Sequence, residues 1–382
     1  MNRKIVKTAL IVLAAAAIVI IAGGALLSML GVEVFCLGSE NGRMALEPCG
    51  GEAPLTADTN PPQIAAGAQP ILIDTDMAVD DWLAILYLLQ RPDVDVRAIT
   101  VAGTGEAHCG PGVKNALDLV ALAGRPEIPV ACGHETPLQG NHVFPQSWRD
   151  NVDRLAGLSI PANPTQPQGE DAAALITGAV RDAGGDLLII TLGPLTNLAQ
   201  AFAEDPAVAR EVKEIFVMGG AMSVPGNVGM VPETGIENDR AEWNIYVDPY
   251  AASQVLASGA PVTLVPLDAT NQVVLDKSFY DRLEGDRASP EAEFVYRALT
   301  QNIGFVNSGL YYFWDPLTAA IAVDQGLGSF ASQPVLVIEE EGPEVGAVRV
   351  DESGSLVRIT VAAEEERFKQ EFLDVLNGRV ME

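Results

Sequence analysis

Four aspartates, Asp74, Asp76, Asp80 and Asp81, lie within eight positions of the stretch ILIDTDMAVDDW. Carboxylates this close repel one another unless a cation offsets their charge, and hard cations prefer oxygen ligands such as these. A single aspartate at the start of a helix would need no such explanation, because it could cap the helix or interact with its dipole. Four together favour a metal site over a solvated acidic loop.

This acidic stretch lies where a buried strand is expected to end. The apolar run before Asp74 predicts a strand over 70–74, and the pattern after it predicts a helix over 80–90. Ligands of open α/β sheets bind beyond the carboxyl ends of the strands. The acids therefore lie at the edge of the predicted sheet where a ligand is expected.

Other segments are predicted to end at the same edge with suitable polar groups. TLGPLTN offers the main-chain carbonyl of Leu192, and GNVG offers Asn227. AEWNIYVDP offers Glu242 and Asn244. WDPL places Asp315 just before a predicted helix, with a proline at a favoured early position. These groups are candidates for the same site.

After residue 70, short apolar runs alternate with helical patterns, which is typical of an α/β fold. The runs are continuous, as expected of strands covered on both faces. Strands are predicted over 70–74, 95–103, 128–133, 186–193, 214–220 and 261–268, and helices over 80–90, 112–123, 195–204 and 249–258. The C-terminal part is predicted to add short antiparallel strands and a closing helix. We predict one doubly wound domain over 70–382, with a mostly parallel central sheet and antiparallel additions.

The N-terminus has a different character. Residues 9–32 contain no charged side chain, and three basic residues precede them. At about 1.5 Å per residue, a helix of this length spans a hydrocarbon core of about 30 Å. We predict a membrane anchor over 1–33, uncleaved rather than a cleaved signal, and a flexible tether over 34–69. The basic flank would place the domain outside the cytoplasm, at the cell membrane, or secreted if the segment is cleaved.

Charge and cysteine content limit the partners and the compartment. The net charge of −28 argues against a basic surface for nucleic acid and favours a small neutral or cationic ligand. Four cysteines suit an exported protein. Cys36 and Cys49 could close a disulfide, whereas Cys109 and Cys132 are predicted to be buried thiols. None of the four has the spacing of a metal site.

The ordered set DTDMAVDD, LGPLTN, VMGG, GN, AEWNIYVDP and WDPL resembles the inosine-uridine-preferring nucleoside hydrolases. The resemblance covers roughly residues 70–380, nearly the whole predicted domain. It implies calcium-dependent hydrolysis of the N-glycosidic bond of ribonucleosides, which gives free base and ribose. The implied partner is a small nucleoside, and a homo-oligomer is compatible with the resemblance.

The resemblance also implies roles for individual residues. In such a site one Ca²⁺ also binds the ribose 2′- and 3′-hydroxyls and a water. Its protein ligands here would be Asp76, Asp81, Asp315 and the main-chain carbonyl of Leu192. Asp76 would also act as the general base, and Asp80 would accept a hydrogen bond from the 2′-hydroxyl.

Four further residues are given supporting roles by the same resemblance. Asn227, Glu242 and Asn244 match positions that hold the ribose hydroxyls. Asp74 lies beside the metal ligands and would organise them. Carboxylate and amide oxygens around the sugar would favour the positive charge that develops on it during hydrolysis.

The sequence departs from the uridine-hydrolysing members at one position. These carry a histidine directly before the last metal-binding aspartate, where this chain has Trp314. That substitution resembles the purine-preferring branch, in which tryptophans stack on the base. Trp148 in FPQSWR would supply the second stacking ring. The resemblance therefore implies a preference for purine nucleosides.

A second departure is Thr104, which stands where many members have an asparagine. Glu106 or His108 could replace that contact, near the base or near the ribose. For His108, a buried structural role is the alternative that we favour.

Two other functions are compatible with parts of the sequence. Phosphotransferases of the haloacid dehalogenase type also begin with D-x-D after a strand, but Ala78 and the lack of a matching lysine motif argue against them. A non-catalytic nucleoside-binding surface protein could use the same fold. The four retained acids Asp76, Asp80, Asp81 and Asp315 argue against loss of the chemistry.

Overall fold

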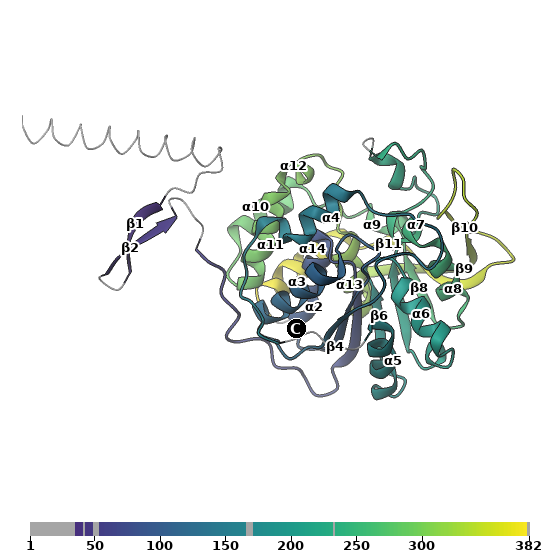
Figure 1. The fold of residues 1–382 in the computed structure, drawn as a ribbon, viewed down its shortest axis with the longest axis horizontal. Helices are drawn as coiled ribbons and strands as arrows, with labels where there is room; N and C mark the ends of the chain where they lie inside the picture. Colours follow the sequence, from purple (N-terminus) through teal and green to yellow (C-terminus); the bar gives the residue numbers. More distant parts are fainter. Residues whose placement is uncertain (1–34, 41–42, 49–52, 166–170, 232–233, 380–382) are drawn as a thin grey trace, which may run out of the picture. The chain divides into compact units, whose positions relative to one another are not determined.

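The computed structural model describes residues 35–40, 43–48, 53–165, 171–231 and 234–379. It contains two compact units, Met1–Pro54 and Leu55–Glu382. In the first unit, strand β1 (Phe35–Glu40) pairs antiparallel with β2 (Arg43–Pro48). The second unit contains all the other described strands and helices (Figure 1).

Within the described ranges, no helix is both long and apolar enough to cross a membrane. The structure therefore gives no support for the transmembrane helix in the predicted fold or for the cell-membrane location derived from it. The segment 1–33, on which both predictions were based, lies outside the described residues.

The second unit begins before the first predicted strand. The main-chain N–H of Asp58 donates to the carbonyl oxygen of Leu122 at 2.6 Å, and that of Ala65 donates to Pro92 at 2.8 Å. This part of the predicted tether therefore lies against the domain.

A nine-stranded sheet forms the centre of the second unit. Its strands are β3 (Gln69–Thr75), β4 (Val94–Val101), β5 (Val130–Cys132), β6 (Leu188–Thr191), β7 (Glu214–Met218), β8 (Val262–Val265), β9 (Gly328–Val337), β10 (Val348–Val350) and β11 (Ser355–Ala363). Their order is β10-β9-β11-β8-β7-β6-β3-β4-β5. The seven strands from β11 to β5 run parallel, and β9 and β10 are antiparallel additions. The predicted antiparallel strands near the C-terminus are confirmed, because β11 pairs antiparallel with β9 and β9 with β10. On its other side, β11 pairs in parallel with β8 and so joins these strands to the parallel sheet.

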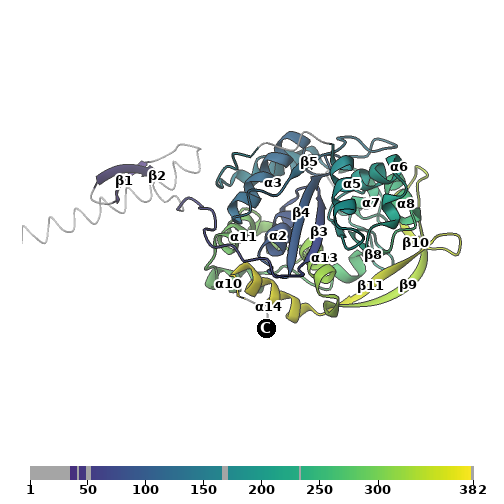
Figure 2. The ribbon, with the colours of Figure 1, turned by 90° about the horizontal axis from the view of Figure 1, so that it is seen from below.

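Helices cover both faces of this sheet (Figures 1 and 2). They are α2 (Val79–Leu89), α3 (Cys109–Leu122), α4 (Gln146–Asp153), α5 (Ala172–Asp182), α6 (Thr196–Glu204), α7 (Trp243–Val247), α8 (Pro249–Ala257), α9 (Leu267–Thr270), α10 (Lys277–Gly285), α11 (Pro290–Gln301), α12 (Ile303–Val306), α13 (Trp314–Val323) and α14 (Glu365–Leu376). Helices α2, α3, α13 and α14 pack on one face, and α5, α6 and α8 pack on the other.

Alternate residues of the strands belong to opposite layers of the core. Ile71 and Ile73 of β3 pack with α2 and α13, whereas Leu72 packs with α5 and α6. Successive side chains of a strand point to opposite faces, so a strand covered on both faces must be apolar throughout. This explains the continuous apolar runs of the sequence.

The chain reverses its direction across the sheet between β3 and β6. It passes from β3 to β4 and β5 on one side and returns to β6 on the other side. Asp74, near the end of β3, lies opposite Thr100 of β4 and Thr191 of β6. The carboxyl ends of β3 and β6 therefore meet at the switch point, where ligands of doubly wound folds bind.

The structure corrects the prediction that Cys109 and Cys132 are buried thiols, because they form a disulfide. Cys109 begins α3 and Cys132 ends β5, and their Cα atoms are 5.6 Å apart. The spacing in the sequence could not show this, since only the packing of α3 beside β5 brings the two cysteines together. The predicted pairing of Cys36 involves Cys49, which lies outside the described residues.

Candidate active site

The turn between β3 and α2 has an unusual backbone. Met77 has a φ of 62°, which is uncommon for a residue with a side chain. Its N–H donates to the hydroxyl of Thr75 at 2.9 Å, and its carbonyl accepts from the indole N–H of Trp82 at 2.8 Å. These bonds hold a strained turn in place. The turn brings Asp76 back toward Asp81, whose Oδ1 accepts from the Asp76 N–H at 3.1 Å.

Three carboxylates converge in front of this turn. Asp80 and Asp81 lie in the first turn of α2, and Asp315 lies in the first turn of α13, which packs against α2. One oxygen from each carboxylate lies within 4.8 Å of the other two. Two helix N-termini therefore meet at this point, and each favours negative charge.

The three carboxylates fit a metal ion. Oδ2 of Asp81 is buried and has no hydrogen-bond partner in the part of the chain that the structure describes. Its Oδ1 accepts from the Thr75 hydroxyl and from the Asp76 N–H. Among the described side chains, no lysine, arginine or histidine forms an ion pair with Asp80, Asp81 or Asp315. A hard cation would supply the partner that this buried oxygen lacks. It would also offset the repulsion between the three carboxylates.

Burial is the main cause that raises the pKa of these carboxyl groups. It raises the pKa of Asp80 and of Asp81 to about 7. Repulsion by neighbours adds to this, from Asp76 and Glu242 at Asp80, and from Asp80 at Asp81. Burial, followed by repulsion from Asp80 and Asp81, also holds the pKa of Asp315 well above its usual value. A bound cation reverses this trend, because it favours the ionised carboxylates.

We therefore expect metal to stabilise the protein more at high pH. The pKa of Asp80 and of Asp81 is about 7 in the fold against 3.8 in the unfolded chain. Without metal, their contribution is complete below pH 3.8 and is lost as the pH rises through 7. A cation at about 100 Kd adds about 2.7 kcal/mol to the free energy of unfolding. Thermal melts with EGTA and with Ca²⁺ should show a larger gain at pH 8 than at pH 5.5, and an equal gain at both would contradict this expectation.

Asp76 is held by the segments on either side of it. Its Oδ1 accepts from the N–H of Ala78 at 3.3 Å, and its Oδ2 accepts from the N–H of Glu106 at 3.2 Å. A Cβ atom at Gly105 would lie 2.1 Å from the Asp76 Cβ, and one at Gly193 would lie 2.7 Å from it. Only glycine allows these two loops to approach so closely. Burial, followed by repulsion from Asp81, raises the pKa of Asp76 well above its usual value.

Asp74 lies behind these groups. Its Oδ1 accepts from the hydroxyl of Thr100 at 2.6 Å and from the amide of Asn197 at 2.8 Å. Burial raises its pKa to about 7, although these two hydrogen bonds oppose the rise. The side chain thus links β3 to β4 and α6, as a residue that organises the end of β3 would.

Glu242 caps the short helix α7. Its carboxylate accepts from the main-chain N–H groups of Asn244 at 2.9 Å, Gly220 at 3.1 Å and Ile245 at 3.2 Å. Burial raises its pKa to about 7, and the main-chain donors lower it. Its repulsion of Asp80 places Glu242 beside the three-carboxylate group.

The other residues predicted to bind the ribose or the metal are Asn244, Leu192 and Asn227, and hydrogen bonds connect them to the start of α7, which Glu242 caps. The Asn244 amide donates to the carbonyl of Leu192 at 3.1 Å and to that of Met218 at 3.3 Å. Oδ1 of Asn227 accepts from the N–H of Trp243 at 3.0 Å. The ends of β6 and β7 and the start of α7 therefore form the wall beside β3.

The two tryptophans predicted to stack on the base are half-buried and belong to different aromatic groups. The Trp314 indole N–H donates to the Asn271 amide oxygen at 3.1 Å, and its ring lies 5.7 Å from that of Tyr311. The Trp148 ring lies 5.6 Å from that of Trp243, which neighbours Glu242. Within the described residues, Trp148 and Trp314 make no ring contact with each other. A nucleoside between them stays a prediction.

The structure separates the two candidates proposed to replace the missing asparagine. Thr104 is buried, with its hydroxyl 3.1 Å from that of Thr196. Nδ1 of the His108 ring lies 2.7 Å from Oδ2 of Asp153. The main-chain N–H of His108 donates to Oδ1 of the same carboxylate at 3.0 Å. Within the described part of the chain, the Glu106 carboxylate has no hydrogen bond or ion pair. Of the two, Glu106 is therefore the one whose carboxylate makes no hydrogen bond to another described residue, although the charge of Arg149 acts on it.

Tyr311 and Arg149 lie near the site and were not predicted from the sequence. Burial raises the pKa of Tyr311 well above its usual value, and the carboxylates of Asp80 and Glu106 raise it further. Arg149 interacts electrostatically with Asp76 and Glu106. Arg149 lies in the short helix α4 and Tyr311 in an irregular segment before α13, and no periodic apolar pattern signalled either position.

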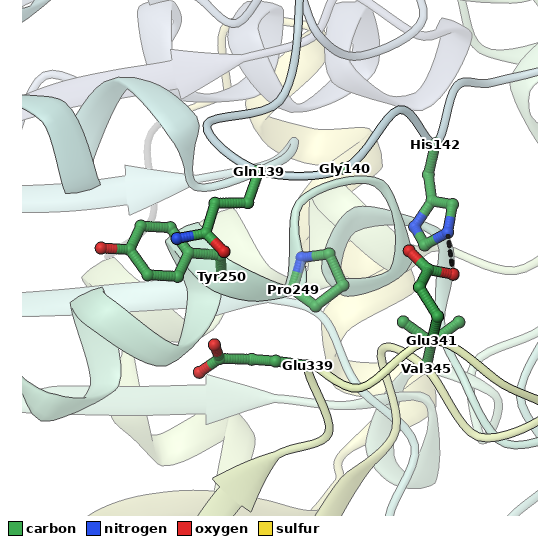
Figure 3. Close-up of a pocket in the computed structure, with 8 residues that line it drawn as sticks. All are labelled: Gln139, Gly140, His142, Pro249, Tyr250, Glu339, Glu341 and Val345. Carbon is green, nitrogen blue, oxygen red and sulfur yellow. Dashed lines mark hydrogen bonds and ion pairs between the residues drawn. The ribbon is translucent and has the colours of Figure 1, made fainter.

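A surface pocket of about 250 Å³ opens elsewhere on the same unit (Figure 3). It is lined by Gln139, Gly140, His142, Pro249, Tyr250, Glu339, Glu341 and Val345. Nε2 of His142 lies 3.3 Å from the Glu341 carboxylate at its rim. None of the predicted site residues lines this pocket, so it is separate from the three-carboxylate group.

Comparison with known proteins agrees with this geometry. The sequence profile described as inosine-uridine preferring nucleoside hydrolase matches residues 71–370. Uridine nucleosidase 1 of Arabidopsis thaliana is 32% identical over 289 residues, which are 74% of this chain and 82% of that protein. A plant nucleoside hydrolase structure has a TM-score of 0.73 at 29% identity, covering 81% of this chain and 99% of that one. A purine-preferring ribonucleoside hydrolase from Gardnerella vaginalis has a TM-score of 0.70 at 29% identity, with the same coverage.

The fold and the acidic site thus define an enzyme that hydrolyses the N-glycosidic bond of ribonucleosides. The chain belongs to the inosine-uridine preferring nucleoside hydrolase family. This confirms the resemblance seen in the motifs and decides against the phosphotransferase alternative. The family is metal-dependent, in agreement with the acidic group at Asp80, Asp81 and Asp315.

Proposed function

We propose that the protein is a calcium-dependent ribonucleoside hydrolase that prefers purine nucleosides. The observation that supports the calcium site is the group of three carboxylates, two of them buried, which have no cationic partner among the described residues; Oδ2 of Asp81 has no donor among them either. The proposed ligands are Asp76, Asp81, Asp315 and the main-chain carbonyl of Leu192. When bound, Ca²⁺ would lower the pKa of a coordinated water and hold the ribose hydroxyls.

The protein residues then divide the remaining work. Asp76 takes the proton from the attacking water, because its carboxylate is fixed by the N–H groups of Ala78 and Glu106. Asp80 accepts a hydrogen bond from the 2′-hydroxyl, and Asn227, Glu242 and Asn244 hold the ribose. Their oxygens favour the positive charge that develops on the sugar as the base departs.

The direct test is release of free base from inosine by the purified protein. We expect turnover with Ca²⁺, its loss with EGTA and its recovery when Ca²⁺ is added back. A nucleoside-binding protein without catalysis would bind inosine in calorimetry and release no base under any of these conditions. Turnover that is unchanged by EGTA would remove the proposed metal dependence while leaving the family assignment intact.

The proposed purine preference depends on Trp314. Its indole N–H is a weak acid and is bonded to Asn271, so it cannot protonate a departing pyrimidine. Its half-buried ring can stack on a base, and a purine offers N7 for protonation by solvent or a nearby donor. The names of the relatives point both ways, to uridine in Arabidopsis and to purines in Gardnerella, so the argument depends on this residue of the chain itself.

Replacing Trp314 with alanine should therefore reduce purine turnover selectively. Base–aromatic stacking contributes about 1–3 kcal/mol per base, so kcat/KM for inosine should fall by about 5- to 150-fold. Turnover of uridine should change little, and Trp314→Phe should retain most of the inosine activity. If Trp314 only packs in the protein, the alanine variant will lower the melting temperature and leave the inosine-to-uridine ratio unchanged. Equal wild-type rates on inosine and uridine would also contradict the proposal.

A further inference from the structure

Arg149 lies in α4 with its side chain buried, at 6% exposure. Its Nη2 donates to the carbonyl of Gly103 at 2.8 Å and, more weakly, to that of Ala107 at 3.5 Å. These two carbonyls stand at the two ends of the loop 103–107, which joins β4 to α3. One guanidinium thus connects both ends of the loop.

The middle of this loop contacts Asp76 from the main chain. The N–H of Glu106 donates to Oδ2 of Asp76, and the N–H of Ala107 donates to its carbonyl at 2.9 Å. Gly105 lies against the Asp76 Cβ. The shape of the loop therefore fixes the direction in which the Asp76 carboxylate points.

The disulfide fills the space on another side of the same loop. A Cβ atom at Gly103 would lie 2.7 Å from Sγ of Cys109, which is bonded to Cys132. The loop is therefore confined between this covalent bond and the guanidinium of Arg149. Of the two, only the guanidinium reaches both ends of the loop.

We propose that Arg149 is a positioning residue for Asp76, which it orients through the loop 103–107. This inference rests on the proposed role of Asp76 as the base. Both bonds come from Nη2, which the rigid, planar guanidinium holds in one place between the two carbonyls, whereas the ammonium of lysine is a compact charge on a flexible stem. Small displacements of a reacting group can cost about 100-fold in rate, so a loosened loop should affect turnover.

The test compares Arg149→Gln and Arg149→Lys with the control Arg154→Gln, at an exposed position just after the same helix. For Arg149→Gln, kcat at saturating Ca²⁺ should fall by about 10- to 100-fold, while KM stays within about threefold. The Ca²⁺ affinity from calorimetry should fall less than kcat, because the other proposed ligands, Asp81, Asp315 and the Leu192 carbonyl, are not held by the loop. The kcat of Arg149→Lys should fall less, and the kcat of Arg154→Gln should equal that of the wild type. Guanidinium at about 20 mM, far below the molar concentrations that unfold proteins, should partly restore Arg149→Gln, and urea should not.

Hydrogen exchange gives a readout that does not depend on activity or on metal. In metal-free protein, Arg149→Gln should speed exchange of the N–H groups of Glu106 and Ala107 and leave α2 unchanged. An unchanged kcat, or unchanged exchange in the loop, would overturn the inference. So would a loss of kcat at saturating Ca²⁺ that comes with faster exchange throughout the protein and no rescue by guanidinium, because that pattern indicates a general structural role.

Failure of this inference can be told apart from failure of the proposed function. If Asp76→Asn stays active, Asp76 is not the base and the proposed mechanism is wrong. If Asp76→Asn is inactive while Arg149→Gln retains full kcat, the mechanism stands and only the role of Arg149 is wrong.

Discussion

Asp76→Asn should lower kcat by about 10²–10⁴. Asparagine has the size of aspartate, and its amide oxygen can still accept from the N–H of Glu106. It cannot accept the proton of the attacking water, so the loss falls on the chemical step. The fold should remain, because the substitution removes a buried carboxylate whose repulsion raises the pKa of Asp80 and Asp315.

This expectation is measured by base release at saturating nucleoside and saturating Ca²⁺. Asp182→Asn is the matched control, since Asp182 is exposed at the end of α5 and far along the chain from the site. Near-wild-type turnover of Asp76→Asn would exclude Asp76 as the base. Added Ca²⁺ should not restore this variant, because a missing proton acceptor is not replaced by a cation.

The central sheet could be predicted because each of its predicted strands is a continuous apolar run in the sequence. Each of the six strands predicted from continuous apolar runs is present, since strands buried on both faces need apolar residues throughout. The edge near the C-terminus was harder to predict. β11 pairs with β8 on one side and β9 on the other, and its own residues do not reveal which neighbour runs parallel.

The site was predictable only where its residues are concentrated in one motif. Asp80 and Asp81 are adjacent in the sequence, and their crowding with two more aspartates is enough to indicate a cation. The place of Asp315 before a predicted helix made it a candidate, but its role as a ligand came only from the family resemblance, because the packing of α13 against α2 is what brings it close. Arg149 carries no signal at all, since its role depends on the path of the loop from β4 to α3.

Asp315→Ala should weaken metal binding rather than remove the base. Asp315 is the one proposed ligand that comes from α13, so the substitution leaves the turn after β3 intact. Loss of partners outside the metal's own ligand set costs about 10- to 100-fold in affinity, and loss of a ligand should cost at least as much. Calorimetry should show this fall in Ca²⁺ affinity, and millimolar Ca²⁺ should restore part of the lost turnover, unlike in Asp76→Asn.

The stability of the metal-free variant separates a ligand from a structural aspartate. Burial and repulsion by Asp80 and Asp81 hold the pKa of Asp315 well above its usual value, so its ionised form destabilises the metal-free fold. This cost is absent when the group is protonated and grows as the pH rises through its raised pKa. At pH 8 with EGTA, Asp315→Ala should therefore melt at or above the wild-type temperature, and it should gain less from Ca²⁺. If Asp315 instead holds α13 in place, the variant will melt lower with and without Ca²⁺, and Ca²⁺ affinity will not change.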